Sequence, residues 1–599
     1  MSLVVTVDLV VVAQYACTLL LAYYCVQFSG IFFEWPVARA SVDPALAEAP
    51  SGGKTFDLKA HESAGASGKL DTSVVKCWDP CTLADLGSVP ATAPADVVAA
   101  VARCRAAQAT WASSTFAQRR TLMKIMLRFV VENQATIARV AVRDSGKTLT
   151  DAIFGEVLVT CEKLKWLAHS GEAALAPEVR ETGSMVWFTK KVHVEYRPLG
   201  VIGAIVPWNY PFHNVFNPVS AALMSGNGIV VKVSEYASWS AAGYFGAALK
   251  ACLAAAGAPE DLVQIVHGYG ATGAALVGGG VDKVIFVGSP GVGKKVMEHA
   301  SKTLTPVVLE LGGKDPFVVC DDVDDGDLDR IAQIALRGVF QSMGQNCAGP
   351  ERFFVGARAY AGFTRRIKAV ADELVVGASN DDAAVDCGAV TMGSLSRDRL
   401  QALVDDAVSK GARVLSRGKR DPKDLEGSSF FPPTVLVDVP MTAKIAHDEI
   451  FGPIMCVFEP TTSDADAVAK ANACGFGLSS CAFAKDAARA AAVASELKAG
   501  MSSVNDLEGT TYLSQSLPFG GVGESGFDKF AGPEGLRGLC LTRSVCVDRL
   551  AFMRTSIPPP IQYPSKGKGH VFAMGLVELF YGNGLFGKIN GIIKLLKAM

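Results

Sequence analysis

Apolar and polar positions alternate regularly in the middle of this 599-residue chain. Short apolar runs bounded by turn residues predict β-strands at 201–206, 229–233, 262–266, 283–287 and 306–310. Segments with helical spacing of apolar residues lie between these strands, at 212–225, 238–256, 270–279 and 291–303. Strands that alternate with helices in this way predict an α/β fold, in which a parallel sheet is joined by crossover helices.

Periodic patterns also flank this region. Helical spacing predicts helices over 95–110 and 117–142, and alternation of apolar residues predicts a strand over 185–196. A second α/β region is expected from about 313 to 510, and it includes a helix near 328–339. The chain therefore contains more than one structural unit, as its length also indicates.

The N-terminus has a different pattern. Residues 9–33 contain no charged side chain, and about 20 apolar residues suffice for a helix to cross a bilayer core. The run therefore predicts a transmembrane helix within a membrane anchor over 1–40. A cleaved signal peptide is the alternative, with a cleavage-like Ala-Arg-Ala at 38–40, but Asp8 precedes the run in place of basic residues. Positive charge follows the run, which predicts that the protein body faces the cytosol, at the endoplasmic reticulum or another endomembrane.

The segments next to the folded region carry two further predictions. Residues 41–75 are rich in Ala, Gly, Ser, Pro and Asp and predict a flexible linker. The C-terminal extension over 551–599 contains an amphipathic helix, which either lies in a membrane interface or docks on the protein body. Its apolar face consists of Leu585, Phe586, Ile589, Ile592, Ile593 and Leu596.

Composition narrows the class of protein. The formal net charge is −2, and no stripe of Lys and Arg lies beside aromatic residues, so no nucleic-acid partner is expected. The 15 cysteines have no regular spacing, which favours reduced thiols over a disulfide framework. Cys77 and Cys81 have no second pair and no histidine cluster nearby, so no metal site is expected.

Side chains capable of chemistry follow the predicted strands. Asn209 follows the first strand, where its amide can donate to a developing oxyanion, although an ordinary turn residue is the alternative. Lys232 and Glu235 follow the second strand, where a carboxylate can accept a hydrogen bond from a ribose hydroxyl, although surface charges are the alternative.

A glycine-rich turn at 288–293 follows the fourth strand and opens a helix, whose free N–H groups suit a phosphate. The same residues resemble a P-loop, which would indicate a nucleoside triphosphatase. That motif needs Ser or Thr after its lysine to hold Mg²⁺, and Lys295 stands there instead. The turn therefore suits a dinucleotide better.

The most informative residues are Glu310, in Glu-Leu-Gly-Gly-Lys, and Cys347, in Gly-Gln-Asn-Cys. A thiol paired with a carboxylate indicates covalent acyl chemistry with a general base, although a single cysteine is more often a buried apolar residue. Glu449, in Glu-Ile-Phe-Gly-Pro, and a glycine-rich loop at 518–526 follow.

These motifs, in this order, resemble those of the aldehyde dehydrogenase superfamily over about 80–550. The apolar leader and extended tail are also similar to those of the membrane-associated family-22 group of plants and algae. The superfamily resemblance implies a Rossmann-like NAD(P)-binding domain, an α/β catalytic domain and a small β oligomerisation arm. The NAD(P)-binding domain is expected at 76–184 with 200–312, and the catalytic domain at 313–538. The oligomerisation arm is expected at 185–199 with 539–550.

The resemblance implies roles for individual residues. Cys347 is expected to be the nucleophile, Glu310 the general base and Asn209 an oxyanion donor. NAD is the expected cofactor, with NADP as the alternative, because Glu235 would repel a 2′-phosphate. The expected cofactor-binding residues are Val206, Pro207, Trp208, Lys232, Glu235, Gly288, Ser289, Gly293, Leu311, Glu449 and Phe451.

The implied reaction is NAD(P)-dependent oxidation of an aldehyde to a carboxylic acid, through a thiohemiacetal and a thioester on Cys347. The alternatives are acyl transfer to coenzyme A, whose enzymes typically lack the base at position 310, and a non-catalytic membrane-anchored scaffold. A long-chain or lipid-derived aldehyde and a homodimer or homotetramer are expected. Two positions depart from the family pattern: Pro218 replaces a lysine thought to relay protons, and Pro290 replaces a common threonine.

Overall fold

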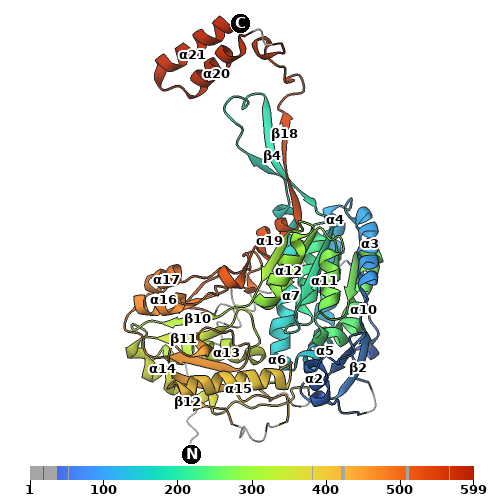
Figure 1. Ribbon diagram of the computed structural model, residues 1–599, viewed down its shortest axis with the longest axis vertical. Helices are drawn as coiled ribbons and strands as arrows, with labels where there is room; N and C mark the ends of the chain where they lie inside the picture. Colours follow the sequence, from blue (N-terminus) through green and yellow to red (C-terminus); the bar gives the residue numbers. More distant parts are fainter. Residues whose placement is uncertain are drawn as a thin grey trace, which may run out of the picture.

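Two sheets with their covering helices form the body of the molecule, and a long arm leads from this body to a pair of C-terminal helices (Figure 1). The computed structural model describes Thr18 and residues 37–50, 53–380, 382, 384–419, 425, 427–507, 512–564 and 567–599.

The first sheet has the strand order β17-β9-β8-β5-β6-β7. Its strands are β5 (Val201–Val206), β6 (Gly228–Val233), β7 (Val263–Val266), β8 (Lys283–Val287), β9 (Val307–Glu310) and β17 (Gly526–Phe527). Only β17 is antiparallel to its neighbour. The predicted strands and their parallel arrangement are confirmed, with starts that differ by at most one residue.

Helices join these strands where the sequence predicts them. They are α8 (His213–Met224), the run of α9 (Ser238–Ser240), a π-helical turn (Ala241–Phe245) and α10 (Gly246–Ala255), then α11 (Gly270–Gly278) and α12 (Pro290–Ser301). The strand order reverses between β5 and β8, and open α/β sheets bind ligands outside such a reversal point. Asn209 follows β5 and Gly288 follows β8, so both lie at this point.

The second sheet has the strand order β12-β13-β14-β11-β10-β15-β16, and only β12 is antiparallel to its neighbour. Its strands are β10 (Asp315–Val319), β11 (Pro350–Val355), β12 (Arg413–Ser416), β13 (Thr434–Val439), β14 (Ile454–Phe458), β15 (Cys481–Phe483) and β16 (Ser503–Val504). Its helices are α13 (Leu328–Phe340), α14 (Ala357–Ala371), α15 (Ser394–Ser409), α16 (Asp464–Asn472) and α17 (Ala487–Glu496).

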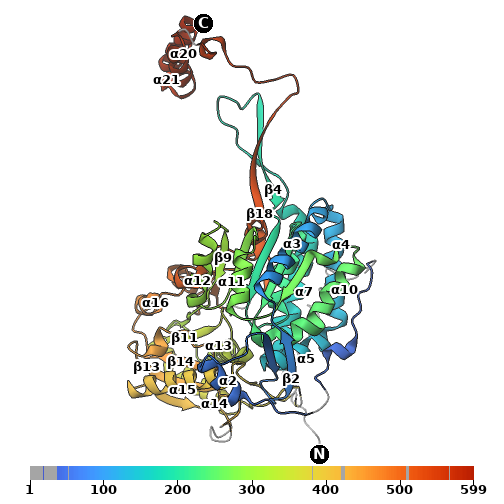
Figure 2. The same ribbon diagram turned by 45° about the vertical axis from the view of Figure 1, so that its right-hand side comes forward.

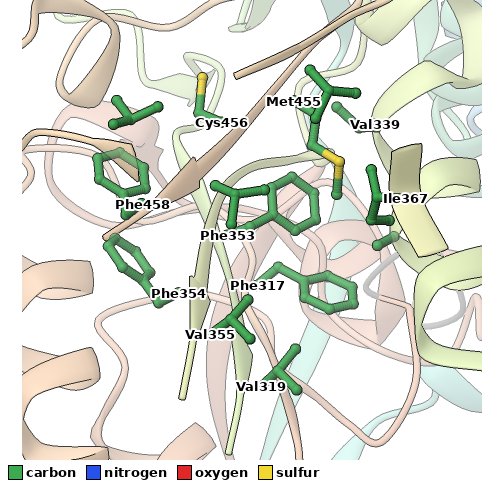
Figure 3. Packing of buried hydrophobic residues seen from close by; sticks show 14 of the residues in the cluster. Phe317, Val319, Val339, Phe353, Phe354, Val355, Ile367, Met455, Cys456 and Phe458 are labelled. Atoms are coloured by element: carbon green, nitrogen blue, oxygen red, sulfur yellow. The ribbon is translucent and has the colours of Figure 1, made fainter. Parts of the chain in front are cut away.

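The core of this second unit explains its continuous apolar strands. Every residue of β10, β11 and β14 is buried, because helices cover both faces of a parallel sheet. Figure 3 shows Phe317, Phe353 and Met455 packed together, with Val339 of α13 and Ile367 of α14 beside them. This core fixes the position of the segment that leaves α13 toward Cys347.

The arm is an antiparallel sheet of β3 (Glu178–Arg180), β4 (Lys190–Pro198) and β18 (Cys540–Asp548). The prediction of a strand over 185–196 is wrong at its start. Residues 185–189 form turns, in which the N–H of Val186 donates to the carbonyl of Gly183 at 2.9 Å. Apolar residues two positions apart in this exposed turn have the spacing of a strand, which explains the wrong prediction.

Two further predictions need correction. The helix expected over 117–142 is two helices, α4 (Phe116–Glu132) and α5 (Gln134–Ser145). Asn133 separates them, because its side-chain amide donates to the carbonyl of Phe129 at 2.8 Å and ends α4. α3 (Pro94–Trp111) matches its prediction.

The flexible linker expected over 41–75 is wrong for its described part. This segment forms α2 (Leu58–Ala66) and the start of β1 (Val74–Trp78), which pairs with β2 (Asp85–Pro90). The ring of Phe56 stacks on that of Trp78 at 4.7 Å. The segment therefore packs on the body, because its apolar residues contact side chains of the body.

The two ends of the chain differ in what the structure describes. The predicted transmembrane run 9–33 lies outside the described residues, apart from Thr18. Among the helices of the described part, none combines the length and the apolar character needed to cross a membrane. At the other end, α20 (Gly569–Tyr581) and α21 (Gly584–Ala598) form a helical hairpin. Figures 1 and 2 both place this hairpin beyond the arm, apart from the body.

Candidate active site

A cavity of about 390 Å³ lies where the first sheet faces the second, and it brings Asn209, Glu310 and Cys347 together. Val206, at the end of β5, lines it as well. Its other walls are mainly apolar and aromatic, and they include Phe154, Val159, Tyr512, Leu513, Phe519 and Phe530. Three residues chosen from distant motifs thus share one pocket with apolar walls.

An unusual turn presents Cys347 to this pocket. Ser342, Met343 and Gly344 adopt left-handed backbone conformations in succession, with φ of 50°, 60° and 66°. A Cβ atom on Gly344 would lie 2.2 Å from the carbonyl oxygen of Gly452, so only glycine fits. The N–H of Ser342 donates to the Asp151 carboxylate at 2.9 Å. The turn is therefore held by contacts from two other segments.

Glu310 is the last residue of β9 and is 1 % exposed. The two glycines that follow allow the chain to pass close to the cysteine segment, because a Cβ atom on Gly313 would lie 2.6 Å from the carbonyl oxygen of Cys347. The Glu-Leu-Gly-Gly-Lys motif therefore sets the carboxylate beside the thiol.

Burial controls the protonation of this pair. It raises the pKa of Glu310 to about 7, although the interaction with the Cys347 thiol lowers it in part. Burial, and then the neighbouring Glu310, raise the pKa of the Cys347 thiol. A carboxylate with a pKa near neutrality can accept a proton from a thiol or from water and release it again.

The amide of Asn209 is held in one orientation. Its Nδ2 donates to the carbonyl of Gln345 at 2.9 Å, and its Oδ1 accepts a hydrogen bond from Nδ2 of Asn214 at 3.1 Å. Because an amide nitrogen carries two hydrogens, Asn209 can use its second N–H toward a group in the pocket. Sequence reasoning missed Asn214, which stands in the first turn of α8 with no motif around it.

The residues expected around the phosphates and ribose lie at the carboxyl ends of β6 and β8. The Lys232 ammonium pairs with the Glu235 carboxylate at 3.7 Å. Ser289 precedes α12, and no side-chain cap occupies the N-terminus of this helix within the described chain. A Cβ atom on Gly293 would lie 2.4 Å from Cδ2 of Leu311, so this glycine lets α12 approach the strand end next to Glu310.

Glu449 and Phe451, which are expected around the nicotinamide ribose and ring, lie between the two sheets. The ring of Phe451 meets edge-on, at 5.5 Å, the ring of Trp208, which is expected in the adenosine and pyrophosphate part of the cofactor site. The Glu449 carboxylate accepts a hydrogen bond from the N–H of Gly313 at 3.2 Å. Burial and the nearby Glu351 raise the pKa of Glu449 to about 8. The segment that carries Glu449 and Phe451 thus reaches the glycines after Glu310.

Glu351 is a second residue that sequence reasoning missed. Its carboxylate pairs with Lys314 at 2.7 Å and accepts hydrogen bonds from the N–H groups of Ile450 and Phe451 at 2.9 Å. It therefore ties the Glu449–Phe451 segment to the lysine of the Glu-Leu-Gly-Gly-Lys motif. Its partners are far away along the chain, so no local pattern indicates this role.

These features fit a nicotinamide dinucleotide. Uncapped N–H groups at the start of α12 suit a pyrophosphate, and the Glu235 carboxylate suits ribose hydroxyls. Pro290 is the first residue of α12, a position that proline favours, so the replacement of the common threonine by Pro290 preserves the helix start.

Two further prolines lie near the site. The carbonyl of Pro207 accepts a hydrogen bond from Nδ2 of Asn214 at 3.5 Å. Pro218 lies within α8 and lines the cavity, so the lysine that the family pattern has at this position has no counterpart here.

The chain belongs to the aldehyde dehydrogenase family, whose model matches its residues 68–545. An aldehyde dehydrogenase-like protein of Saccharomyces cerevisiae is 38% identical over 597 residues, which cover 95% of this chain and 91% of that protein. The NADP-dependent succinate-semialdehyde dehydrogenase GabD of Escherichia coli is 31% identical over 469 residues, 77% of this chain and 92% of that protein.

Solved structures agree with this assignment. The aldehyde dehydrogenase of Mycobacterium tuberculosis complexed with NAD⁺ has a TM-score of 0.72 and 27% identity, and the match covers 81% of this chain and 96% of that one. The chain is therefore an NAD(P)-dependent enzyme that oxidises an aldehyde to a carboxylic acid.

Proposed function

We propose that Cys347 is the nucleophile of this oxidation, Glu310 its general base and Asn209 its oxyanion donor. One observation carries the proposal: Cys347, Glu310 and Asn209 line the same pocket, and both carboxylate oxygens of Glu310 are buried there without a hydrogen-bond partner in the described part of the chain. The CoA-acylating alternative lacks such support, because a base beside the cysteine serves hydrolysis of the thioester by water.

In the first half of the reaction, the Cys347 thiol gives its proton to Glu310 and the thiolate attacks the carbonyl carbon. The second N–H of Asn209 and the backbone N–H of Cys347 stabilise the resulting oxyanion. A nicotinamide dinucleotide, when bound, would supply the hydride acceptor for this carbon. Glu449 and Phe451 would hold its nicotinamide ribose and ring.

Before the second half, Glu310 releases the thiol proton to solvent and is ionised again. It then takes a proton from water, whose oxygen attacks the thioester carbonyl. The C–S bond breaks, the carboxylic acid gives its proton to the Cys347 thiolate and leaves as a carboxylate, and Glu310 releases the proton of the water to solvent. Replacing Asn209 by Ala removes one oxyanion donor, which typically lowers turnover about 10²–10³-fold. If kcat of this variant stays near that of the unaltered enzyme, the assignment of Asn209 is wrong.

We further propose a preference for NAD over NADP. The Glu235 carboxylate stands at the end of β6, where it would repel a 2′-phosphate, and Lys232 is already paired with it. The ratio of kcat/KM for the two coenzymes tests this proposal. A clear NADP preference would contradict it, and Glu235→Gln should shift the ratio toward NADP.

The substrate is proposed to be a long-chain or lipid-derived aldehyde. The aromatic and aliphatic walls of the 390 Å³ cavity support this class, because apolar walls favour an apolar chain. A series of linear aldehydes tests it: kcat/KM should rise with chain length. A maximum at the shortest members, or at semialdehydes with a second carboxylate, would contradict it.

The membrane anchor is also a proposal. The uncharged run 9–33 supports an N-terminal helix that holds the protein at the endoplasmic reticulum or another endomembrane, with the body in the cytosol. Protease treatment of sealed microsomes should then digest the body. Full protection of the body would contradict this orientation.

A homodimer or homotetramer is proposed through the arm. β18 is an edge strand with exposed Leu541 and Val547, and β16 is an edge strand of the second sheet. Unpaired edges are ready to pair with another chain. Leu541→Asp with Val547→Asp should lower the mass measured by light scattering, and an unchanged mass would contradict the proposal.

A further inference from the structure

The hairpin of α20 and α21 is a separate unit at the end of the molecule. β18 ends at Asp548, and the chain then passes through a short helix (Pro559–Ile561) before α20 begins. Figures 1 and 2 show the hairpin apart from both sheets, so the active-site cavity does not involve it. The alternative in which the amphipathic helix docks on the body is therefore wrong for this chain.

Close contact between two glycines holds the hairpin together. A Cβ atom on Gly575 would lie 2.9 Å from the carbonyl oxygen of Gly591, and one on Gly591 would lie 2.5 Å from the backbone nitrogen of Leu579. The Glu578 carboxylate adds polar contacts across the helices, to Lys594 and, at 2.9 Å, to Asn590. The two helices of the hairpin therefore cover each other's inner faces.

The outer face of α21 is apolar and exposed. Phe586 is 89 %, Leu585 73 % and Leu596 67 % exposed. Successive residues lie about 100° apart around a helix, so the whole apolar set falls within an arc of about 120°. That set is Leu585, Phe586, Ile589, Ile592, Ile593 and Leu596. Such a continuous apolar surface on an exposed helix indicates a binding function.

Charge on α21 follows the edges of this arc. Lys588 and Lys597 are exposed and lie on its two sides, whereas Lys594 lies away from it and is paired with Glu578. The sequence of α21 contains no acidic residue. Lysines at the borders of an apolar arc can place their stems on the apolar side and their ammonium groups at the level of lipid headgroups.

The second helix also carries exposed apolar residues. Met574, Val577 and Tyr581 of α20 are exposed at 47 %, 59 % and 65 %. Its one acidic residue, Glu578, is already bonded to α21. A second copy of the chain would offer the same lysines, and the one acidic side chain of its two helices is already bonded, so an anionic lipid surface is the more complementary partner.

We propose that the α20–α21 hairpin binds the surface of a bilayer that contains anionic lipid. The apolar arc of α21 enters the region between headgroups and acyl chains, and Lys588 and Lys597 contact the anionic headgroups. This contact is additional to the anchor proposed for 9–33 and independent of the catalytic assignment. It would hold the outer end of the arm against the membrane.

The test uses the full chain with the N-terminal run disabled by Leu19→Asp, Leu20→Asp and Leu21→Asp, so that the hairpin acts alone. Co-sedimentation with vesicles of phosphatidylcholine and phosphatidylserine measures binding. The parent with the disabled run should bind, and adding Phe586→Asp and Ile593→Asp should weaken binding by about tenfold or more. Lys588→Gln with Lys597→Gln should weaken binding to mixed vesicles and leave binding to pure phosphatidylcholine unchanged.

A matched control separates this surface from general hydrophobicity. Leu304 is 88 % exposed and lies in the turn after α12, on the body, so Leu304→Asp should leave vesicle binding unchanged. Retained NADH formation shows that each variant is folded. The proposal is overturned if the parent with the disabled run fails to bind, or if the hairpin variants bind equally well. Concentration-dependent self-association that Phe586→Asp removes, without vesicle binding, would assign the face to a second copy.

Discussion

At the scale of single residues, burial gives the site its chemistry. Glu310 is an ordinary carboxylate by sequence, but its enclosed position raises its pKa to about 7. Burial, and then the neighbouring Glu310, also raise the pKa of the Cys347 thiol well above its ordinary value. In the proposed mechanism one proton passes from Cys347 to Glu310, so activity should depend on the charge of Glu310.

This dependence predicts a pH profile. Glu310 must be ionised to act as a base, and its pKa is raised, so kcat should fall by about tenfold per pH unit below about pH 7 and level off above it. Steady-state NADH formation at saturating aldehyde and coenzyme measures the profile. A kcat that stays constant from pH 8 down to pH 5 would show that another group controls the rate-limiting step.

Asn214 provides a second residue-scale prediction, because it fixes the orientation of the Asn209 amide. Asn214→Leu should free that amide to rotate and lower kcat by about tenfold or more, up to the loss expected for removing the oxyanion donor. Asn217→Leu is the matched control, since Asn217 lines the same cavity from the same helix. Equal effects of both substitutions, or an effect on KM alone, would argue for general damage to the pocket.

The residues that carry chemistry were predictable from sequence where a motif surrounds them, as for Asn209, Glu310 and Cys347, which the structure places in one pocket. Asn214 and Glu351 were not predictable. Each acts through a hydrogen bond to a group on another segment, and such a contact appears only when the chain is folded.

At the scale of elements, prediction succeeded where burial is uniform. The strands of the first sheet are short apolar runs because helices cover both faces, and their bounds follow the sequence closely. It failed where one side chain or a neighbouring segment decides the structure. Asn133 splits a long helical pattern, and the apolar residues of 185–188 lie in an exposed turn.

The turn before Cys347 is an element whose geometry can be tested. Gly344→Ala introduces a strained left-handed residue and a clash with the carbonyl of Gly452, so we expect a loss of more than about 2 kcal/mol in unfolding free energy and a large fall in kcat. Thermal unfolding and NADH formation measure the two effects.

Gly257→Ala is the control for this substitution. Gly257 has a similar φ of +64° but open space around it, so it should cost only about 1 kcal/mol from backbone strain and leave kcat unchanged. If both variants lose the same stability, contact with Gly452 does not constrain the turn that carries Cys347.

At the scale of the whole molecule, the active site exists only because two sheets meet. Asn209 and Glu310 come from the first sheet, Cys347 follows α13 of the second unit, and Phe519 and Phe530 close the cavity from near the end of the body. The sequence predicted each α/β unit, but it did not predict how the two units face each other. Contacts between segments that are distant along the chain produce no periodic pattern of apolar residues. The arm and hairpin extend the molecule beyond this catalytic body (Figure 1).

We propose that Cys347 forms a thioester and that Glu310 activates the water that hydrolyses it. The most direct test is rapid mixing of Glu310→Gln with aldehyde and NAD, followed by intact-mass and peptide analysis. We expect a burst of about one NADH per active site, then a stall. The acyl group should be found on Cys347, and Cys347→Ala should show neither burst nor adduct. Continued turnover by Glu310→Gln, or an adduct on another residue, would contradict this mechanism.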